Sequence, residues 1–214
     1  MTALREGMPP LPARMQSLPI DDRGYPVPYF VAWLDGKPDF RVTDPRKWMR
    51  CYREQRCWVC GDVVGKYKTF VIGPMCAVNR TTAEPPCHVE CAVFSATACP
   101  FLTLPKAQRR EANLPTNTKD MPGVGLLRNP GVTCLWTTLQ FEAFKVDNGV
   151  LIRLGDPTSV AWYAEKQHAN RTQVLASIDS GMPILRKMAE EEGPQSIAML
   201  DQYYQRMLPL LPTE

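Results

Sequence analysis

Two short motifs in the sequence carry the residue types that bind transition metals. The first, Cys57-Trp58-Val59-Cys60-Gly61, separates two thiols by two residues. This spacing lets both sulfurs reach one tetrahedral ion, and the glycine lets the backbone fold back beneath it. The second, His88-Val89-Glu90-Cys91, has the i, i+3 spacing that places two side chains on one helix face. The sequence therefore predicts a zinc site formed by Cys57, Cys60, His88 and Cys91.

The segment between the two motifs indicates how they are joined. Residues 61–87 are long enough for a β-hairpin, and residues 68–73 are typical of one of its strands. A knuckle, a hairpin and then a helix whose first turn carries two ligands is the order of a treble-clef zinc motif. We expect this order here.

Other cysteines leave the ligand set open. Cys87 could replace His88, and Cys76 and Cys99 are also near in sequence. Buried free cysteines are a second interpretation, but they have no reason to recur in such pairs with a histidine. Disulfides are disfavoured because the chain begins without a recognisable secretory signal.

Four available ligands favour a closed, structural site over a catalytic one, which keeps a position open for water. A nuclease of the His-Asn-His kind needs a histidine base beside its metal. The sequence has only His88 and His168, and the first is assigned to zinc. Phosphate-loop, nucleophile-elbow, paired-carboxylate and Ser/His/Asp motifs are not found.

Composition is that of a globular protein with many loops. The 214 residues are 44% hydrophobic and 22% charged, and the 21 prolines are about twice the usual share. This length suffices for one large domain or two small ones. No apolar run is long enough for a transmembrane helix, and Met1 to Pro19 lack the apolar core of a signal peptide. We expect a cytoplasmic protein with no membrane contact.

The charge distribution points to the metal-bearing half. The net charge is +3, with 16 Lys and Arg against 11 Asp and Glu in residues 1–113, and 9 against 11 thereafter. A predicted helix at 45–56 carries a basic stripe beside the knuckle, which favours phosphate contacts. A solvated basic face is the alternative, because Glu54 can pair with Arg50. The predicted nucleic-acid-binding residues are Arg46, Lys47, Arg50, Arg53, Arg56 and Trp58.

Hairpin and helix signals occur twice, which predicts an α+β fold with a ββα unit on each side of the zinc motif. The first unit has strands at 29–34 and 39–42 and a helix opened by Asp44-Pro45. The second has strands at 141–146 and 150–154 and a helix opened by Asp156-Pro157. Residues 132–136 supply a further strand.

We predict four regions from these signals. Residues 1–27 form an extended arm, 28–113 hold the first ββα unit and the zinc region, and 114–131 form a loop or linker after a short polar helix at 106–113. Residues 132–214 hold the second unit and a helical tail. In the tail, a helix from Thr172 breaks at Gly181, restarts at Pro183 and is followed by another at 195–208.

Several phrases resemble uncharacterised proteins of bacteria and their phages. They include Phe70-Val71-Ile72-Gly73-Pro74-Met75-Cys76, Glu84-Pro85-Pro86-Cys87-His88-Val89-Glu90-Cys91, Cys99-Pro100-Phe101-Leu102 and Gly155-Asp156-Pro157-Thr158-Ser159-Val160, besides the knuckle itself. The resemblance spans most of the chain. Such proteins have no established activity, so it implies a phage-associated setting and no function.

Our first hypothesis is a non-enzymatic, zinc-stabilised protein that binds nucleic acid through the basic helix. A host or phage protein bound by the terminal helices is the second, and a metal-dependent nuclease the third. A small-molecule substrate is not indicated.

Overall fold

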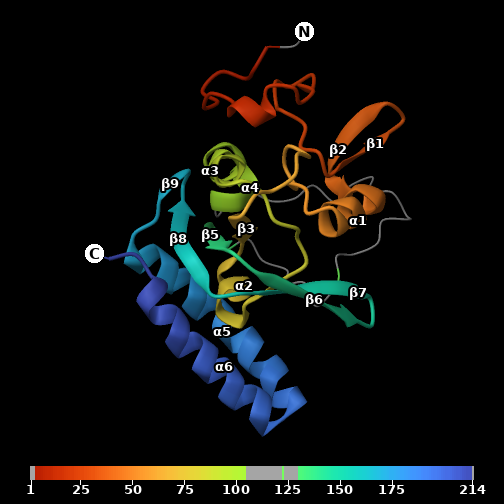
Figure 1. The fold of residues 1–214 in the computed structure, drawn as a ribbon. Helices are drawn as coiled ribbons and strands as arrows, with labels where there is room; N and C mark the ends of the chain where they lie inside the picture. Colours follow the sequence, from red (N-terminus) through yellow and green to blue (C-terminus); the bar gives the residue numbers. More distant parts are fainter. Residues whose placement is uncertain (1–2, 105–121, 123–129, 214) are drawn as a thin grey trace.

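The computed structural model describes residues 3–104, 122 and 130–213 of the chain. The fold is mixed α+β, as predicted, and the described residues form three antiparallel sheets (Figure 1). The four-stranded central sheet has the order β3-β5-β8-β9, with strands β3 (Lys68–Ile72), β5 (Val132–Thr138), β8 (Pro157–Ala164) and β9 (Gln167–His168). The other two contain β4 (Thr81–Thr82), β7 (Gly149–Leu154) and β6 (Phe141–Val146), and β1 (Val31–Leu34) with β2 (Lys37–Thr43).

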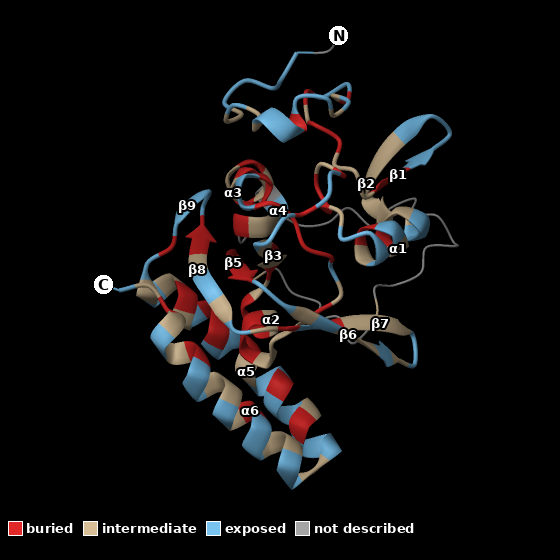
Figure 2. Cartoon of the chain, viewed as in Figure 1, coloured by how far each residue is buried: buried red, intermediate tan, exposed pale blue. Residues whose placement is uncertain are grey.

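Both faces of the central sheet are covered, and every residue of β5 is buried (Figure 2). Because side chains alternate along a strand, β5 serves two cores. Cys134 and Trp136 pack into a core with helices α2 (Pro74–Asn79), α5 (Arg171–Glu192) and α6 (Pro194–Met207). Leu135 packs into a second core with α3 (Val89–Ala98) and the metal-ligand cysteines. The metal-ligand region thus forms one covering layer of the sheet.

The first ββα unit forms as predicted. The β1–β2 hairpin turns at Asp35 and Gly36, both with positive φ, and α1 spans Pro45–Arg53. The Asp44 carboxylate accepts hydrogen bonds from the backbone N–H groups of Arg46 and Lys47 at 2.9 and 3.3 Å, which satisfies otherwise unpaired donors of the first turn.

The prediction of a second ββα unit is wrong in its last element. Strands β6 and β7 form, but residues 157–164 are strand β8 rather than a helix. Their β-branched and aromatic residues fit a pleated surface, and β8 pairs with β5 along most of its length. The Asp156 carboxylate, expected to cap a helix, instead forms an ion pair of 2.6 Å with Arg80.

The C-terminal region is helical, with one correction. Helix α5 begins with a capping box between Asn170 and Gln173 and runs unbroken through Gly181 and Pro183, where a break was predicted. A proline inside a helix costs about 3 kcal/mol. The continuous buried face of α5 offsets this cost, since Val174, Ile178, Leu185 and Ala189 all enter the first core. Helix α6 agrees with the predicted helix at 195–208 to within one residue at each end.

The N-terminal arm packs along the body. Its short 3₁₀ helix, η1 (Ala13–Met15), inserts Met15 at 1% exposure into the second core. Helix α3 ends at Ala98, because Cys99 precedes Pro100 and is extended, and α4 spans Pro100–Thr103. The predicted helix at 106–113 and most of the predicted linker at 114–131 lie outside the described residues. Within the described part, no helix is both long and apolar enough to cross a membrane.

The indole of Trp162 provides a test of the first core. It is 3% exposed, and its Nε1–H donates to the Leu210 carbonyl at 2.9 Å. We expect Trp162→Phe to lower the free energy of unfolding by about 1–3 kcal/mol, because a half-buried carbonyl loses its partner and the buried ring becomes smaller. Trp33→Phe in the exposed β1 strand is the matched control. Equal urea midpoints for the two variants would contradict this packing.

Candidate metal centre

The knuckle is a tight turn closed by backbone hydrogen bonds. The Gly61 N–H donates to the Cys57 carbonyl at 2.9 Å, and the Cys60 N–H points at the Cys57 sulfur at 3.4 Å. Gly61 has a φ of +87°, which favours glycine, and the Tyr29 ring packs where a Cβ would stand. The turn therefore presents both sulfurs on one side.

The second pair of ligands lies at the start of α3. His88 is the N-cap with extended backbone, and Cys91 lies in the first turn of the helix. Just before them, the backbone of Cys87 exchanges two hydrogen bonds with Thr69 of β3, at 2.7 and 3.0 Å. This single bridge replaces the returning strand of the predicted hairpin, and α2 and β4 lie between its two residues in the sequence. The central sheet therefore fixes where α3 begins.

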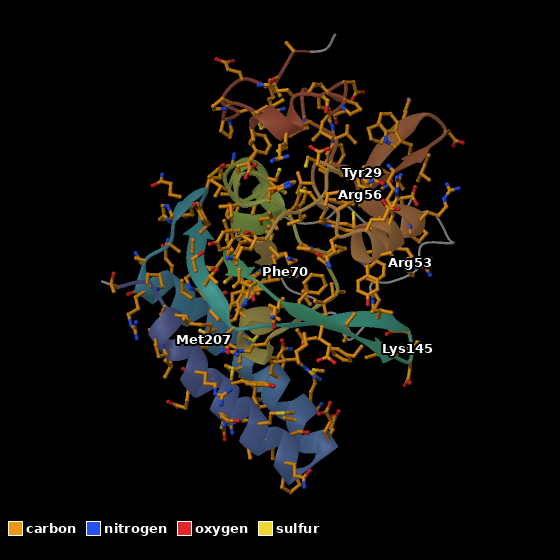
Figure 3. The ribbon with its side chains drawn as sticks, in the orientation of Figure 1. Tyr29, Arg53, Arg56, Phe70, Lys145 and Met207 are labelled. Atoms are coloured by element: carbon orange, nitrogen blue, oxygen red, sulfur yellow. The ribbon has the colours of Figure 1, made fainter. Side chains whose placement is uncertain are left out.

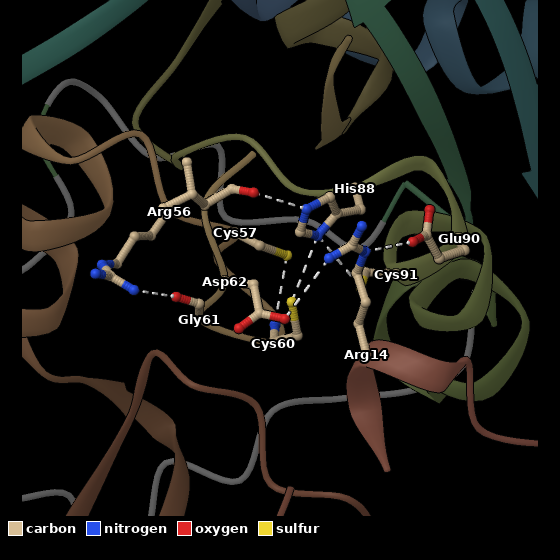
Figure 4. A network of polar contacts seen from close by, with 10 residues as sticks. Arg14, Arg56, Cys57, Cys60, Gly61, Asp62, His88, Glu90 and Cys91 are labelled. Atoms are coloured by element: carbon tan, nitrogen blue, oxygen red, sulfur yellow. Dashed lines mark hydrogen bonds and ion pairs between the residues drawn. The ribbon is translucent and has the colours of Figure 1, made fainter. Parts of the chain in front are cut away.

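The four predicted ligands lie together and could hold a metal ion (Figure 4). Their donor atoms are all within 4.8 Å of one another. The Nδ1 atom of His88 lies 3.4 Å from the Cys60 sulfur and 4.0 Å from the Cys91 sulfur. Bond lengths of about 2.3 Å to sulfur and 2.0–2.1 Å to nitrogen put tetrahedral ligands roughly 3.5–3.8 Å apart. The two separations lie just below and just above that range, so the donors are close enough that they could hold one small ion.

The histidine tautomer also suits a metal. The His88 Nε2 atom is 3.1 Å from the Val63 carbonyl oxygen, so this nitrogen carries the proton and donates it. In the neutral ring, Nδ1 then has the lone pair that a metal needs, and this atom faces the Cys60 and Cys91 sulfurs. A backbone carbonyl holding the second ring nitrogen is the usual support of a metal-bound histidine.

The electrostatics of the metal-free cluster favour a cation. Hydrogen bonds from the Cys60 and Cys91 thiols hold the pKa of Cys57 far below that of an ordinary thiol. The pKa values of Cys60 and Cys91 are raised, because each thiol hydrogen-bonds to the Cys57 sulfur and burial disfavours further negative charge. A divalent ion would supply the positive charge that allows all three to ionise.

The remaining cysteines lie outside this group. The Cys87 thiol, which the sequence left as an alternative ligand, donates to the Thr69 carbonyl at 3.1 Å. Cys76 and Cys99 are not among the clustered donors found in the described residues. Burial raises the pKa of Cys134, which lies in the first core.

Arg14 of the N-terminal arm spans the two ligand turns. Its guanidinium lies 3.8 Å from the Asp62 carboxylate beside the knuckle and 3.1 Å from that of Glu90 in α3 (Figure 4). About half of each side chain is exposed, so each pair contributes at most about 1 kcal/mol. The arm thus contacts both halves of the site.

The predicted nucleic-acid-binding residues differ in whether their charged groups already have partners within the protein. Arg50 and Arg56 both pair with Glu54, and Arg56 also donates to the Gly61 carbonyl at 3.0 Å. Lys47 donates to the Val31 carbonyl at 2.9 Å. The solvated-face alternative therefore describes much of the stripe.

Two members of the predicted set, Arg46 and Arg53, keep exposed guanidinium groups. The Arg46 side chain is 93% exposed, and its ion pair with the helix cap, Asp44, is a long one, with 3.8 Å between its Nε atom and the carboxylate. The assignment of Trp58 to the nucleic-acid-binding residues needs correction. This residue is only 7% exposed, and its ring stacks on that of Phe30 with 4.4 Å between the ring centroids. It cannot stack on a base, because its ring is part of the core.

A groove that the sequence did not indicate lies between the end of α1 and the β5–β6 turn. Its volume is about 510 Å³, and its lining includes Tyr52, Arg53, Gln55, Lys68, Gln140 and Phe141. The lining residues that the structure describes come from three separate segments, and none of them is acidic. Only Arg53 belonged to the predicted basic stripe; the remaining residues carry no sequence motif.

Comparison with known proteins gave no match. No protein-family model matches the sequence, and no curated protein or solved structure matches at the significance threshold.

The ligand set predicts which cysteine controls metal content. We expect Cys91→Ser to abolish stoichiometric zinc binding, since it removes one of four donors from a buried site. Cys76→Ser, outside the cluster, should retain one ion per chain. Metal analysis of the purified variants and the thiolate charge-transfer band of the cobalt-loaded protein would measure this. Equal metal content in both variants would contradict the assignment.

Gly61 tests the backbone of the knuckle. A Cβ at this position would lie 2.7 Å from the Tyr29 ring, and the φ of +87° adds about 1–2 kcal/mol of strain. We expect Gly61→Ala to lower the melting temperature. Gly65→Ala, in the same loop, meets no atom within 4 Å and should leave it unchanged. A similar melting temperature for both variants would rule out the tight turn.

Proposed function

We propose that this chain is a non-enzymatic protein, stabilised by zinc, whose partner is nucleic acid. Three thiolates and one imidazole are a donor set that suits zinc, and tetrahedral Cys₃His sites are typically structural. A knuckle followed by two ligands at the start of a helix supports a treble-clef-like motif. The intervening helix α2 and the single Thr69–Cys87 bridge make it an atypical one.

The structural role of the metal is supported by the closure of the site. Four protein donors converge, and Cys57, His88 and Cys91 are at most 8% exposed. A fourth protein ligand occupies the position that a catalytic zinc keeps for water. The other histidine, His168 of β9, packs against Tyr163 of β8 and is not one of the clustered donors. These observations favour a structural ion over the nuclease hypothesis.

The observation that carries the nucleic-acid proposal is the basic groove beside the metal-ligand loop. Arg53 and Lys68 line it, and the described part of its lining contains no acidic residue. The exposed Arg46 extends the positive surface along α1. Because Lys and Arg bind phosphates by releasing counterions, such a surface gives affinity that falls with salt.

A titration of labelled nucleic acid at several salt concentrations tests this function. We expect binding without cleavage, with log affinity falling linearly with log salt. Metal removal by a chelator should abolish binding, because the ion holds the groove-bearing loop. Cleavage that stops on chelation would instead establish the nuclease hypothesis. Failure of the metal-loaded protein to bind DNA or RNA would refute the proposal.

A further inference from the structure

We infer that the groove between α1 and the β5–β6 turn is a site for a single strand of DNA or RNA, with phosphates on Arg53 and Lys68 and a base against Tyr52. This inference rests on the proposed function and specifies its ligand.

The metal centre and the groove share one loop, residues 61–68. At the metal end, the Val63 carbonyl accepts the hydrogen bond from His88. At the groove end, the Val64 N–H donates to the Gln55 carbonyl at 2.7 Å, and the loop passes into β3 at Lys68. The ion therefore holds one wall of the groove against the end of α1.

The positive charges of the groove are available to a ligand. Arg53 is exposed, and the acidic residue next to it, Glu54, is held by Arg50 and Arg56. The Lys68 ammonium lies 3.3 Å from the carbonyls of Gly65 and Lys66, which orient it without neutralising it. Two cations from separate segments thus face one recess.

The strand β6 extends this surface. Phe141 and Ala143 line the groove, and Lys145 follows on the same face of the strand because side chains alternate. Glu142, on the opposite face, pairs with Arg153. Figure 3 shows Arg53 and Lys145 on the same side of the molecule, where α1 faces the β6–β7 hairpin.

The uncharged lining favours a single strand over a duplex. Tyr52 and Phe141 offer ring faces, and the side-chain amides of Gln55 and Gln140 offer donors and acceptors. Single-strand sites combine cations along the backbone with aromatic faces for unstacked bases. Proteins read duplex DNA with an element that protrudes into the major groove of the DNA, which is about 12 Å wide. This site on the protein is a recess instead. Paired bases could not reach the rings inside it.

The test measures fluorescence anisotropy of the metal-loaded protein with a short labelled oligothymidylate, its RNA counterpart and a DNA duplex of equal length. We expect at least one single strand to bind about tenfold more tightly than the duplex. The double variant Arg53→Gln, Lys68→Gln should weaken that binding about tenfold. It should also reduce the salt slope by about 1.4, which corresponds to two phosphate contacts on a single strand. The matched control is Lys187→Gln, Arg206→Gln, which removes the same charge from the exposed surface of α5 and α6.

A second variant separates stacking from charge. Tyr52→Leu should weaken single-strand binding at least about fivefold with an unchanged salt slope, because stacking involves no counterion release. Since Tyr52 also packs against Trp48, the melting temperature and the zinc content of the Tyr52→Leu variant are measured as well. If these change, Tyr52→Phe must restore both the fold and binding for the inference to stand.

The outcomes are distinguishable. Binding of a duplex as tightly as a single strand, or equal affinities for the groove variant and the α5–α6 control, would overturn this inference and leave the proposed function intact. No binding of any nucleic acid would overturn both.

Discussion

Two turns that are far apart along the chain meet at three thiols and one imidazole, and this meeting constrains the charge that the site can carry. Cys60 and His88 are separated by 28 positions, yet the Cys60 sulfur lies 3.4 Å from the histidine nitrogen. Thiols so close and so well buried cannot all ionise without a counter-charge. A divalent ion would resolve this constraint, and coordination energies on the order of 10 kcal/mol are large enough to decide whether such a region folds. An ion at this cluster would tie the knuckle to the first turn of α3, and Arg14 of the N-terminal arm contacts a carboxylate beside each of them.

The central sheet connects the cysteine and histidine cluster to the rest of the molecule, because its strands contribute side chains to both cores. Adjacent residues of β8, Trp162 and Tyr163, belong to different cores, as do the neighbours Leu135 and Trp136 of β5. The layer of helices α2, α5 and α6 is an ordinary apolar core, whereas the opposite layer contains the metal ligands. Strand β3 precedes residues 114–131 and β5 follows them, and the two strands pair in the central sheet. The two halves of the chain therefore share this sheet. Disruption of the cysteine and histidine cluster would therefore loosen the layer on one face of a sheet whose other face has a separate core.

Sequence reasoning reached features that are encoded locally. The ligand spacing selected the four residues that the structure brings together, and Asp44-Pro45 located the start of α1. It failed where tertiary contacts override local signals. Asp156-Pro157 is a helix-start pattern, but pairing with β5 makes the segment a strand. Whether Arg56 and Trp58 can contact a ligand depends on their partners in the fold, which are Glu54 and Phe30 respectively. The groove is lined by three segments that no sequence motif connects.

X-ray absorption at the zinc edge of the purified protein tests the coordination centre most directly. Three sulfurs at about 2.3 Å and one nitrogen at about 2.0–2.1 Å are the shell that Cys57, Cys60, His88 and Cys91 would give. A shell of four sulfurs would mean that another cysteine replaces His88, and a shell with two or fewer sulfurs would mean that the two turns do not share an ion. Either result would contradict this account.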